Sequence, residues 1–177
     1  MNVGGTLTLG DGTRVPVRRV RAGDAAALQR LVGRSSDRSV ELRFLGPLKE
    51  LSDGMAQGFA DVDGRDKFAL VALDPEDSEE IVGVVRYARE GAEEGAEYAA
   101  LIEDRFQGRG LGIRLTRCLI EAARENGIGY LYALIMRENV GMLRLLRDLD
   151  LPERMSWQGD AERVEIELVS WPAKANR

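Results

Sequence analysis

The spacing of apolar residues changes along the chain, and each change predicts a different kind of element. Residues 6–20 alternate loosely between apolar and polar side chains around an Asp11-Gly12 pair. This pattern predicts a β-hairpin, or an edge strand interrupted by Pro16, because proline cannot donate a backbone hydrogen bond to a neighbouring strand. The chain is therefore expected to open with β-structure.

Three helical candidates follow this opening. Their apolar residues recur at the spacing of one helix face, and a short polar residue stands at the N-cap position of two of them. Asp24 precedes the first candidate and Ser52 the third. The three segments cover residues 25–32, 36–45 and 52–61.

The middle of the chain contains three short apolar runs that are typical of buried strands. They cover residues 68–73, 81–87 and 97–102, and the acidic segments DPEDSEE and EGAEEGA separate them. Apolar runs of this length, bounded by turn residues, indicate strands. Because connections this short favour neighbouring antiparallel strands, we expect an antiparallel meander.

The last part of the chain alternates helices with strands. A long amphipathic pattern begins at Leu111 and ends near Gly127, a candidate C-cap. A strand at residues 130–136, a helix at 139–149 and a closing strand at 163–170 follow. The long helix is a crossover that allows the strands on either side of it to run parallel. The predicted fold class is therefore mixed α/β.

A glycine-rich segment, Gln107 to Gly112, lies where the third strand of the meander ends and the long helix begins. Gly108, Gly110 and Gly112 leave backbone N–H groups uncovered in front of a helix N-terminus, where the helix dipole favours anions. A Walker loop would need Gly-Lys-Ser/Thr here, and a Rossmann turn would need a third glycine at Ile113. The segment is thus predicted to bind phosphates by a different pattern.

That pattern, Q-x-x-G-x-G, resembles the pyrophosphate-binding signature of the GNAT superfamily of acetyl-CoA-dependent N-acetyltransferases. The order of the predicted elements is also that of the GNAT fold. Two blocks, VELRFLGPLKELSDGMAQGFADVD and AEYAALIEDRFQGRGLG, further resemble the acetyltransferase domain of bacterial protein-lysine acetyltransferases. The resemblance implies a GNAT domain that uses acetyl-CoA as co-substrate. The length of 177 residues, with no linker-like segment, predicts one domain over residues 1–177, and the lack of histidine argues against a catalytic metal.

The resemblance also implies which residues form the site. Glu97 is the expected general base, and burial beside the thioester would raise its pKa. The backbone N–H of Leu101 is expected to stabilise the oxyanion, where its strand and the next one separate. The acetyl-CoA contacts expected are Leu101, Ile102, Glu103, Gln107, Gly108, Arg109, Gly110, Leu111, Gly112, Asn139 and Met142, with Arg114 as a further candidate.

Glu97 also has a plain alternative interpretation, as one more solvated charge of the acidic segment before it. Glu103 and Asp104 offer the same chemistry nearby, but they lie closer to the expected phosphates and are interpreted as caps of the turn.

The departing thiolate has no obvious proton donor in the sequence. Many superfamily members have a tyrosine seven residues after the position of Asn139, where this chain has Leu146. Tyr87, Tyr130 and Tyr132 are open alternatives. Because the thiol of coenzyme A resembles that of cysteine, with a pKa of about 8.5, we expect no dedicated general acid.

Composition and charge narrow the function classes. The net charge of -5, from 25 basic and 30 acidic residues, argues against nonspecific binding of nucleic acid or anionic membrane. The chain has no histidine, which excludes imidazole chemistry. No apolar run reaches the ~18 residues of a membrane span, and the first residues do not resemble a signal peptide, so a cytoplasmic protein is expected. Cys118, Trp157 and Trp171 are interpreted as packing residues.

Three functions stay open on the sequence alone. The first is transfer of an acetyl group to a protein lysine. The second is acetylation of a small amine such as a polyamine, an amino acid or an antibiotic. The third is a non-catalytic sensor of acyl-CoA. A monomer or a homodimer would suit each of them.

Overall fold

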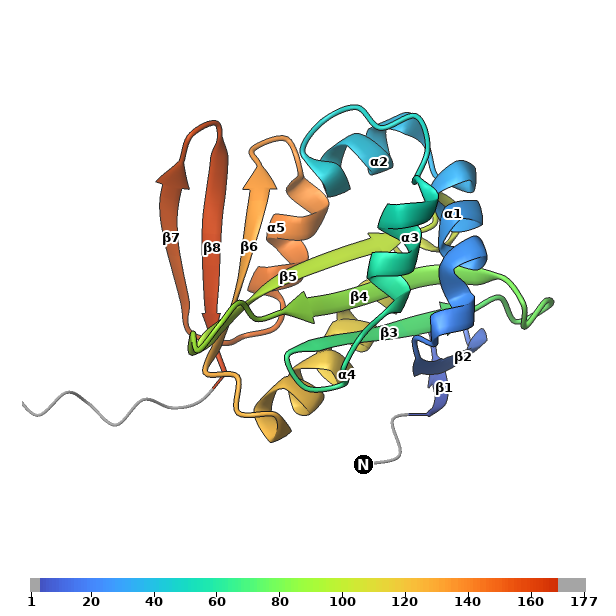
Figure 1. The fold of residues 1–177 in the computed structure, drawn as a ribbon, viewed down its shortest axis with the longest axis horizontal. Coiled ribbons are helices and arrows are strands. Elements are labelled where there is room, and N and C mark those ends of the chain that lie inside the picture. The colour runs from blue at the N-terminus through green and yellow to red at the C-terminus, as the bar shows by residue number, and fades with distance from the viewer. Residues whose placement is uncertain (1–3, 169–177) are drawn as a thin grey trace, which may run out of the picture.

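The computed structural model describes residues 4–168, and its framework is one mixed β-sheet (Figure 1). The 8 strands lie in the order β1-β2-β3-β4-β5-β6-β8-β7. All neighbouring strands are antiparallel except β5 and β6, which run parallel. The predicted mixed α/β fold, with a meander, a crossover helix and a parallel strand pair, is therefore confirmed.

The elements lie close to the predicted ranges, apart from one additional strand, β7. The strands are β1 (Gly5–Thr8), β2 (Arg14–Arg19), β3 (Lys67–Leu73), β4 (Ile81–Ala88), β5 (Gly95–Ile102), β6 (Tyr130–Met136), β7 (Glu153–Gln158) and β8 (Ala161–Glu167). The helices are α1 (Ala25–Arg34), α2 (Asp37–Phe44), α3 (Asp53–Ala60), α4 (Leu111–Glu125) and α5 (Val140–Arg147), with short 3₁₀ turns η1 (Ala22–Asp24) and η2 (Asp104–Phe106).

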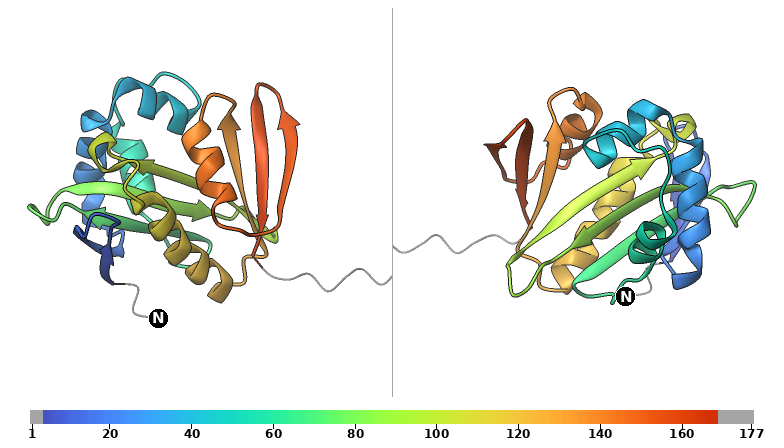
Figure 2. Two further views of the ribbon diagram at one scale, coloured as in Figure 1. Left: turned by 180° about the vertical axis from the view of Figure 1, so that it is seen from behind. Right: turned by 45° about the horizontal axis from the view of Figure 1, so that its top comes forward.

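Helices cover both faces of this sheet. The helices α1 and α3 lie in front of it in Figure 1, whereas α4 and α5 come to the front when the molecule is seen from behind (Figure 2). Because successive strand residues point to opposite faces, each face has its own core. Val85 and Leu115 belong to the core under α4, and Val71 and Leu31 to the core under α1.

Coverage on both faces explains why the central strands are apolar throughout. Leu70 and Val71 are neighbours on β3, and both are fully buried although they face opposite sides. Burial of one such side chain stabilises the fold by about 1.5–3 kcal/mol. The next strand, β4, pairs with β5 in an unbroken register from Gly83–Ile102 to Ala88–Glu97. The strand that carries the candidate base is therefore held by the most buried part of the sheet.

Two predictions near the N-terminus need correction. Pro16 does not interrupt β2, because pairing with β3 begins only at Val17 and the proline pairs with β1 alone. Asp24 precedes α1 as predicted, but its side chain does not cap that helix. Its carboxylate instead accepts hydrogen bonds from the backbone N–H of Arg21 and the guanidinium of Arg18.

The additional strand β7 lies at the edge of the sheet, where it pairs only with β8. All of its residues are exposed, so it lacks the apolar alternation by which strands are predicted. Trp157, which we expected to pack, is exposed on β7 and lies under the guanidinium of Arg137, at 3.9 Å from the ring centroid. Trp171 and the end of the predicted closing strand lie outside the described residues.

Candidate active site

The two parallel strands of the sheet separate soon after they meet. Gly95, Ala96 and Glu97 of β5 are in register with Tyr130 to Tyr132 of β6, and no later residue of β5 pairs with β6. From Glu97 to Ile102 the strand continues for about 17 Å beside this gap, at ~3.4 Å per residue. One edge of β5 is thus available along most of its length.

The register shows which backbone groups face the gap. The N–H of Glu103 donates to the carbonyl of Val82, and Leu101 is directly opposite Val84 in the same regular ladder. In an antiparallel ladder, alternate residues direct both backbone groups to the same neighbour, so Leu101 faces β4. On the other edge, the carbonyl of Glu94 accepts from Gly129, the residue before β6. The even-numbered residues of β5 therefore face the gap.

This pattern corrects two predicted contacts. The amide of Leu101 faces β4 and cannot serve as the predicted oxyanion donor, and Glu103 uses its amide on Val82. The side chain of Glu103 is buried as well, in ion pairs with Arg34 and Arg105. The amides that face the open gap are those of Ala100 and Ile102, because the amide of Tyr98 belongs to the last pairing with β6.

The glycine turn lies at the end of β5. Gln107 donates its backbone N–H to the carbonyl of Asp104, whereas those of Gly108, Arg109 and Gly110 have no backbone acceptor in the part of the chain described. The first N–H groups of α4, at Leu111 and Gly112, have no intrahelical acceptor either. The turn thus presents a row of unpaired donors at the positive end of a helix of 15 residues.

Two of the three glycines are required by backbone conformation and the third by space. Gly108 and Gly110 have φ angles of 69° and 85°, which side-chain-bearing residues rarely adopt. A Cβ on Gly112 would lie 3.0 Å from the Cδ1 atom of Leu145 on α5. The glycines therefore bend the chain and let α5 approach the turn.

The two long polar side chains of the turn are bound within the protein. Gln107 donates from Nε2 to the carbonyl of Ile102 and to the hydroxyl of Ser39. Arg109 pairs with Asp11 and donates to the hydroxyl of Thr13, so its guanidinium fastens the turn to the β1–β2 hairpin. Hydrogen bonds from Thr13, together with Arg109, lower the pKa of Asp11 to about 2. The expected help of the Arg109 side chain in binding phosphates is not supported by this geometry.

A cleft of about 580 Å³ connects the glycine turn with the gap between β5 and β6. Most of the predicted site residues line it together: Glu97, Leu101, Ile102, Gln107, Gly108, Gly110, Gly112, Asn139 and Met142. Glu103, Arg109 and Leu111 do not line it. Asn139 also caps α5, because its side chain accepts from the backbone N–H of Met142 at 3.1 Å.

Glu97 lies where β5 and β6 part, at the end of the gap away from the glycine turn. Its side chain is exposed, so the protein alone does not bury this carboxylate as predicted from the sequence. The neighbouring Asp104 is used elsewhere, since it accepts hydrogen bonds from Ser36 and Ser39 at the start of α2. Of the candidate bases, only Glu97 lines the cleft.

Two arginines near Glu97 were not predicted from the sequence. Arg43 lines the cleft from α2, and Arg86 comes from β4. Desolvation lowers the pKa of Arg43 to about 10, with a further lowering by the charge of Arg86 and an opposing effect of Glu97. Arg86 interrupts the otherwise apolar run of its strand, which was the signal that could have revealed it.

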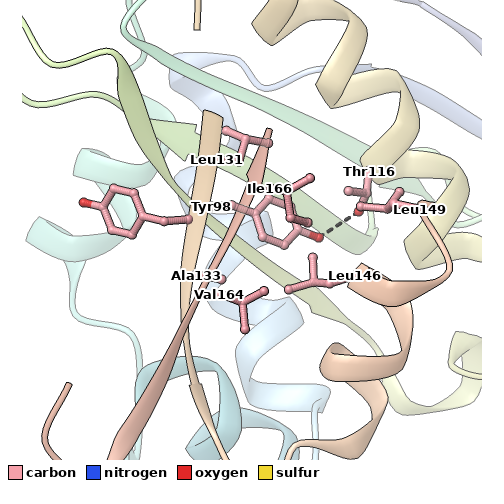
Figure 3. A pocket seen from close by; sticks show the side chains of 9 residues that line it. Tyr98, Thr116, Leu131, Ala133, Leu146, Leu149, Val164 and Ile166 are labelled. Carbon is pink, nitrogen blue, oxygen red and sulfur yellow. Dashed lines mark hydrogen bonds between the residues drawn. The ribbon is translucent and has the colours of Figure 1, made fainter. Parts of the chain in front are cut away.

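Behind the gap, Tyr98 lies beside Leu146, the position at which many superfamily members have a tyrosine. It lines a cavity of about 10 Å³ with Leu146 and Thr116, room for at most a single water (Figure 3). The Thr116 hydroxyl donates to the carbonyl of Gly112, so the Tyr98 hydroxyl donates to Thr116 at 2.7 Å. Burial raises the pKa of Tyr98 to about 12.

None of the three tyrosines left open by the sequence lines the cleft. The hydroxyl of Tyr87 donates to the carbonyl of Arg65, and Tyr132 lies under Arg163, 3.7 Å from the ring centroid. Tyr130 packs over Gly95.

Comparison with known proteins agrees with this geometry. A family model described as an acetyltransferase (GNAT) domain matches residues 14–152. The acetyltransferase PA5475 of Pseudomonas aeruginosa is 37% identical over 143 residues, which cover 80% of this chain and 75% of that protein. The chain belongs to the GNAT acetyltransferase family. It is therefore an N-acetyltransferase, as its glycine turn and element order predicted.

Solved structures of GNAT proteins share the fold. The GNAT domain of S. lividans PAT superimposes with a TM-score of 0.86 and 29% identity, covering 93% of this chain and 96% of that one. The acetyltransferase yncA from Salmonella typhimurium, solved with its cofactor acetyl-CoA, gives a TM-score of 0.69 at 18% identity, with 92% and 98% covered.

Residues 4–168 contain neither a cluster of metal-binding side chains nor a helix suited to span a membrane. No group of three or more His, Cys, Asp or Glu residues in this part of the chain could hold a metal ion. No helix among these residues combines the length and apolar character that a membrane span requires.

Proposed function

We propose that this GNAT enzyme transfers an acetyl group from acetyl-CoA to the side-chain amine of a protein lysine, with Glu97 as general base. The observation that carries the proposal is the cleft itself. It joins a turn of unpaired amides to a carboxylate, along the open edge of one strand.

The residues present fit coenzyme A. The backbone N–H groups from Gly108 to Gly112 have no backbone acceptor in the described part of the chain, so they can donate hydrogen bonds to its diphosphate. The N–H groups of Ala100 and Ile102 and the carbonyls of Tyr98 and Ala100 can pair with the pantetheine arm, as an added strand would. The ~17 Å between Ile102 and Glu97 then leads the thioester toward the carboxylate.

The role of Glu97 is to remove the proton from the acceptor amine. A free lysine has a pKa of about 10.4, so only a small fraction is neutral at pH 7. Glu97 takes this proton, directly or through a water, and the amine nitrogen forms a bond to the carbonyl carbon while the carbon–sulfur bond breaks. The gap-facing N–H of Ala100, in place of that of Leu101, stabilises the negative charge that forms on oxygen. The thiolate leaves and takes its proton from solvent.

Two observations favour a protein lysine over a small polyamine. Among residues 4–168, Glu97 and Asp148 are the only acidic residues that line the cleft. The arginines Arg43 and Arg144 line it too, so this part of the chain does not form the acidic pocket that a polyamine would require. The similarity to the GNAT domain of S. lividans PAT agrees with the sequence blocks that resemble protein-lysine acetyltransferases.

The decisive experiment is incubation of the purified protein with labelled acetyl-CoA and two sets of acceptors. One set is a bacterial lysate analysed by mass spectrometry for acetyl-lysine, and the other is a panel of polyamines, amino acids and aminoglycosides. We expect enzyme-dependent acetylation at defined lysines. Label on small amines alone would replace the protein substrate, and binding of acetyl-CoA without any turnover would indicate a sensor.

A further inference from the structure

An arginine pair that the proposed reaction does not use lies next to α2 and α3. Arg43 lines the cleft, whereas Arg86 lies beside it and does not. Arg86 is opposite Ala99 in the β4–β5 ladder, and Glu97 is opposite Ala88, so the side chains of Arg86 and Glu97 lie on the same face of the sheet. Arg43 reaches this region from α2 and lines the cleft. Both guanidiniums lie against the ring of Phe59, at 4.5 Å for Arg86 and 5.7 Å for Arg43.

Neither guanidinium has an anionic partner. None of the ion pairs found among residues 4–168 includes Arg43 or Arg86, and Glu97 stays outside ion-pair distance of both. The Nη1 atom of Arg86 is buried with no hydrogen-bond acceptor among residues 4–168. Because buried donors are nearly always paired in folded proteins, this guanidinium nitrogen calls for an acceptor that these residues do not supply.

The pair has the properties of a carboxylate site. A guanidinium presents N–H donors in a planar fork that matches two carboxylate oxygens. Phe59 and Phe44 hold the forks by cation–π contacts, which use the ring faces and leave the N–H edges available. Two cations brought close to each other repel, and a bound anion relieves that repulsion.

We propose that Arg43 and Arg86 recognise a carboxylate of the acceptor, next to the amine that Glu97 deprotonates. The inference rests on the proposed function and adds its specificity: the target lysine has an acidic neighbour. The position favours the acceptor as the source of the carboxylate. The glycine turn leads into α4 on one face of the sheet, whereas both arginines lie on the opposite face, with α2 and α3.

The test measures kcat/KM for two matched pairs of acceptors. The first pair consists of peptides with a single lysine flanked by glutamate or by alanine. The second pair is free lysine and cadaverine, which differ only in the α-carboxylate. We expect the acid-bearing member to be preferred by about tenfold, the effect of one charge-assisted pair. This preference should fall to about one in Arg43→Gln and Arg86→Gln.

Two further variants separate recognition from folding. Arg65→Gln removes an exposed arginine whose side chain has no hydrogen bond or ion pair among the described residues, and it should keep the wild-type preference. Arg43→Glu should reverse the preference in favour of a lysine flanked by arginine, which a misfolded or merely loosened protein would not do. Both arginines are half-buried, and Arg43 is the one that lines the cleft, so the Arg43 variants carry the main test.

The outcomes are distinguishable. No preference within either pair overturns the inference, as does a preference that survives in Arg43→Gln. A preference for succinyl-CoA over acetyl-CoA that Arg43→Gln abolishes would move the carboxylate to the acyl donor and also overturn it. Acetylation of free lysine over cadaverine, with no peptide modified, would refute the protein substrate but support the arginine pair. No turnover on any acceptor would overturn both.

Discussion

The two sides of the cleft present different chemical groups, backbone on one side and side chains on the other. The side that faces α4 and α5 is built from backbone, with unpaired amides at Gly108 and Gly110 and the open edge of β5. The α2–α3 side presents side chains: Glu97 and Arg43 line the cleft, and Arg86 lies beside it, sharing the ring of Phe59 with Arg43. Backbone amides recognise a group that every acyl-CoA carries, whereas side chains can be exchanged to select an acceptor. Cofactor affinity and acceptor chemistry should therefore respond to different substitutions.

Glu97→Gln should give the largest effect. Loss of a general base costs about 10²–10⁴-fold in rate, so we expect kcat to fall by at least about 10²-fold. The rise in melting temperature that acetyl-CoA produces should persist, because the amide side is untouched. Glu93→Gln is the matched control, since Glu93 is an exposed member of the same acidic segment. Wild-type kcat in Glu97→Gln would remove this residue from the mechanism.

Gly110→Ala tests the backbone side. A side chain at a φ of 85° costs about 1–2 kcal/mol, which distorts the turn. We expect KM for acetyl-CoA to rise about tenfold, with kcat at saturation nearly unchanged. Gly127→Ala provides the control, because Gly127 has a φ of 73° at the other end of α4 and open space around it. Equal KM values for the two variants would contradict a phosphate site at the turn.

Arg109→Gln should change the KM for acetyl-CoA less than Gly110→Ala does. A basic residue in a phosphate-binding turn would ordinarily be expected to contribute more. Its guanidinium is held by Asp11 and Thr13, so we expect KM for acetyl-CoA to change less than about threefold and the melting temperature to fall slightly. Asp11→Asn distinguishes the two readings. If Arg109 bound phosphate, release from Asp11 would lower KM while Arg109→Gln raised it.

Tyr98→Phe should leave activity unchanged within about twofold, because its hydroxyl donates to Thr116 rather than into the cleft. Its effect should appear in alkaline stability. A folded pKa raised from 10.0 to about 12 stabilises the native state below pH 10, and this contribution is lost as pH rises toward 12. Unfolding titrations should therefore show a shallower alkaline loss in the variant. A large fall in kcat would make Tyr98 the missing proton donor.

Features that depend on consecutive residues could be predicted from the sequence, whereas features that depend on strand pairing or on distant elements could not. The glycine turn is a local motif, and its conformation follows from six consecutive residues. Which edge of β5 an amide faces depends instead on pairing with distant strands, so the choice of Leu101 was off by one residue. Arg43 and Arg86 come from α2 and β4, and nothing in their spacing along the chain indicates that they share Phe59.

The same distinction holds for the fold. Strands that are buried on both faces, such as β3, can be predicted from their continuous apolar runs. All residues of the edge strand β7 are exposed, and its strand conformation depends on backbone hydrogen bonds to β8. Asp24 was placed correctly before α1, but its preference for Arg18 over the helix could not be foreseen without the adjacent strand.

The short parallel pairing of β5 with β6 has a mechanical consequence. Only three residue pairs, Gly95–Tyr130 to Glu97–Tyr132, tie the β6–β8–β7 ribbon directly to the larger part of the sheet. A molecule that spans the opening therefore adds hydrogen bonds between two parts of the sheet that are otherwise joined by this short pairing and by the core under α4. Amide hydrogens near Ala133 and Ile135 should exchange more slowly once acetyl-CoA is added, even though both residues belong to the strand across from the one it pairs with.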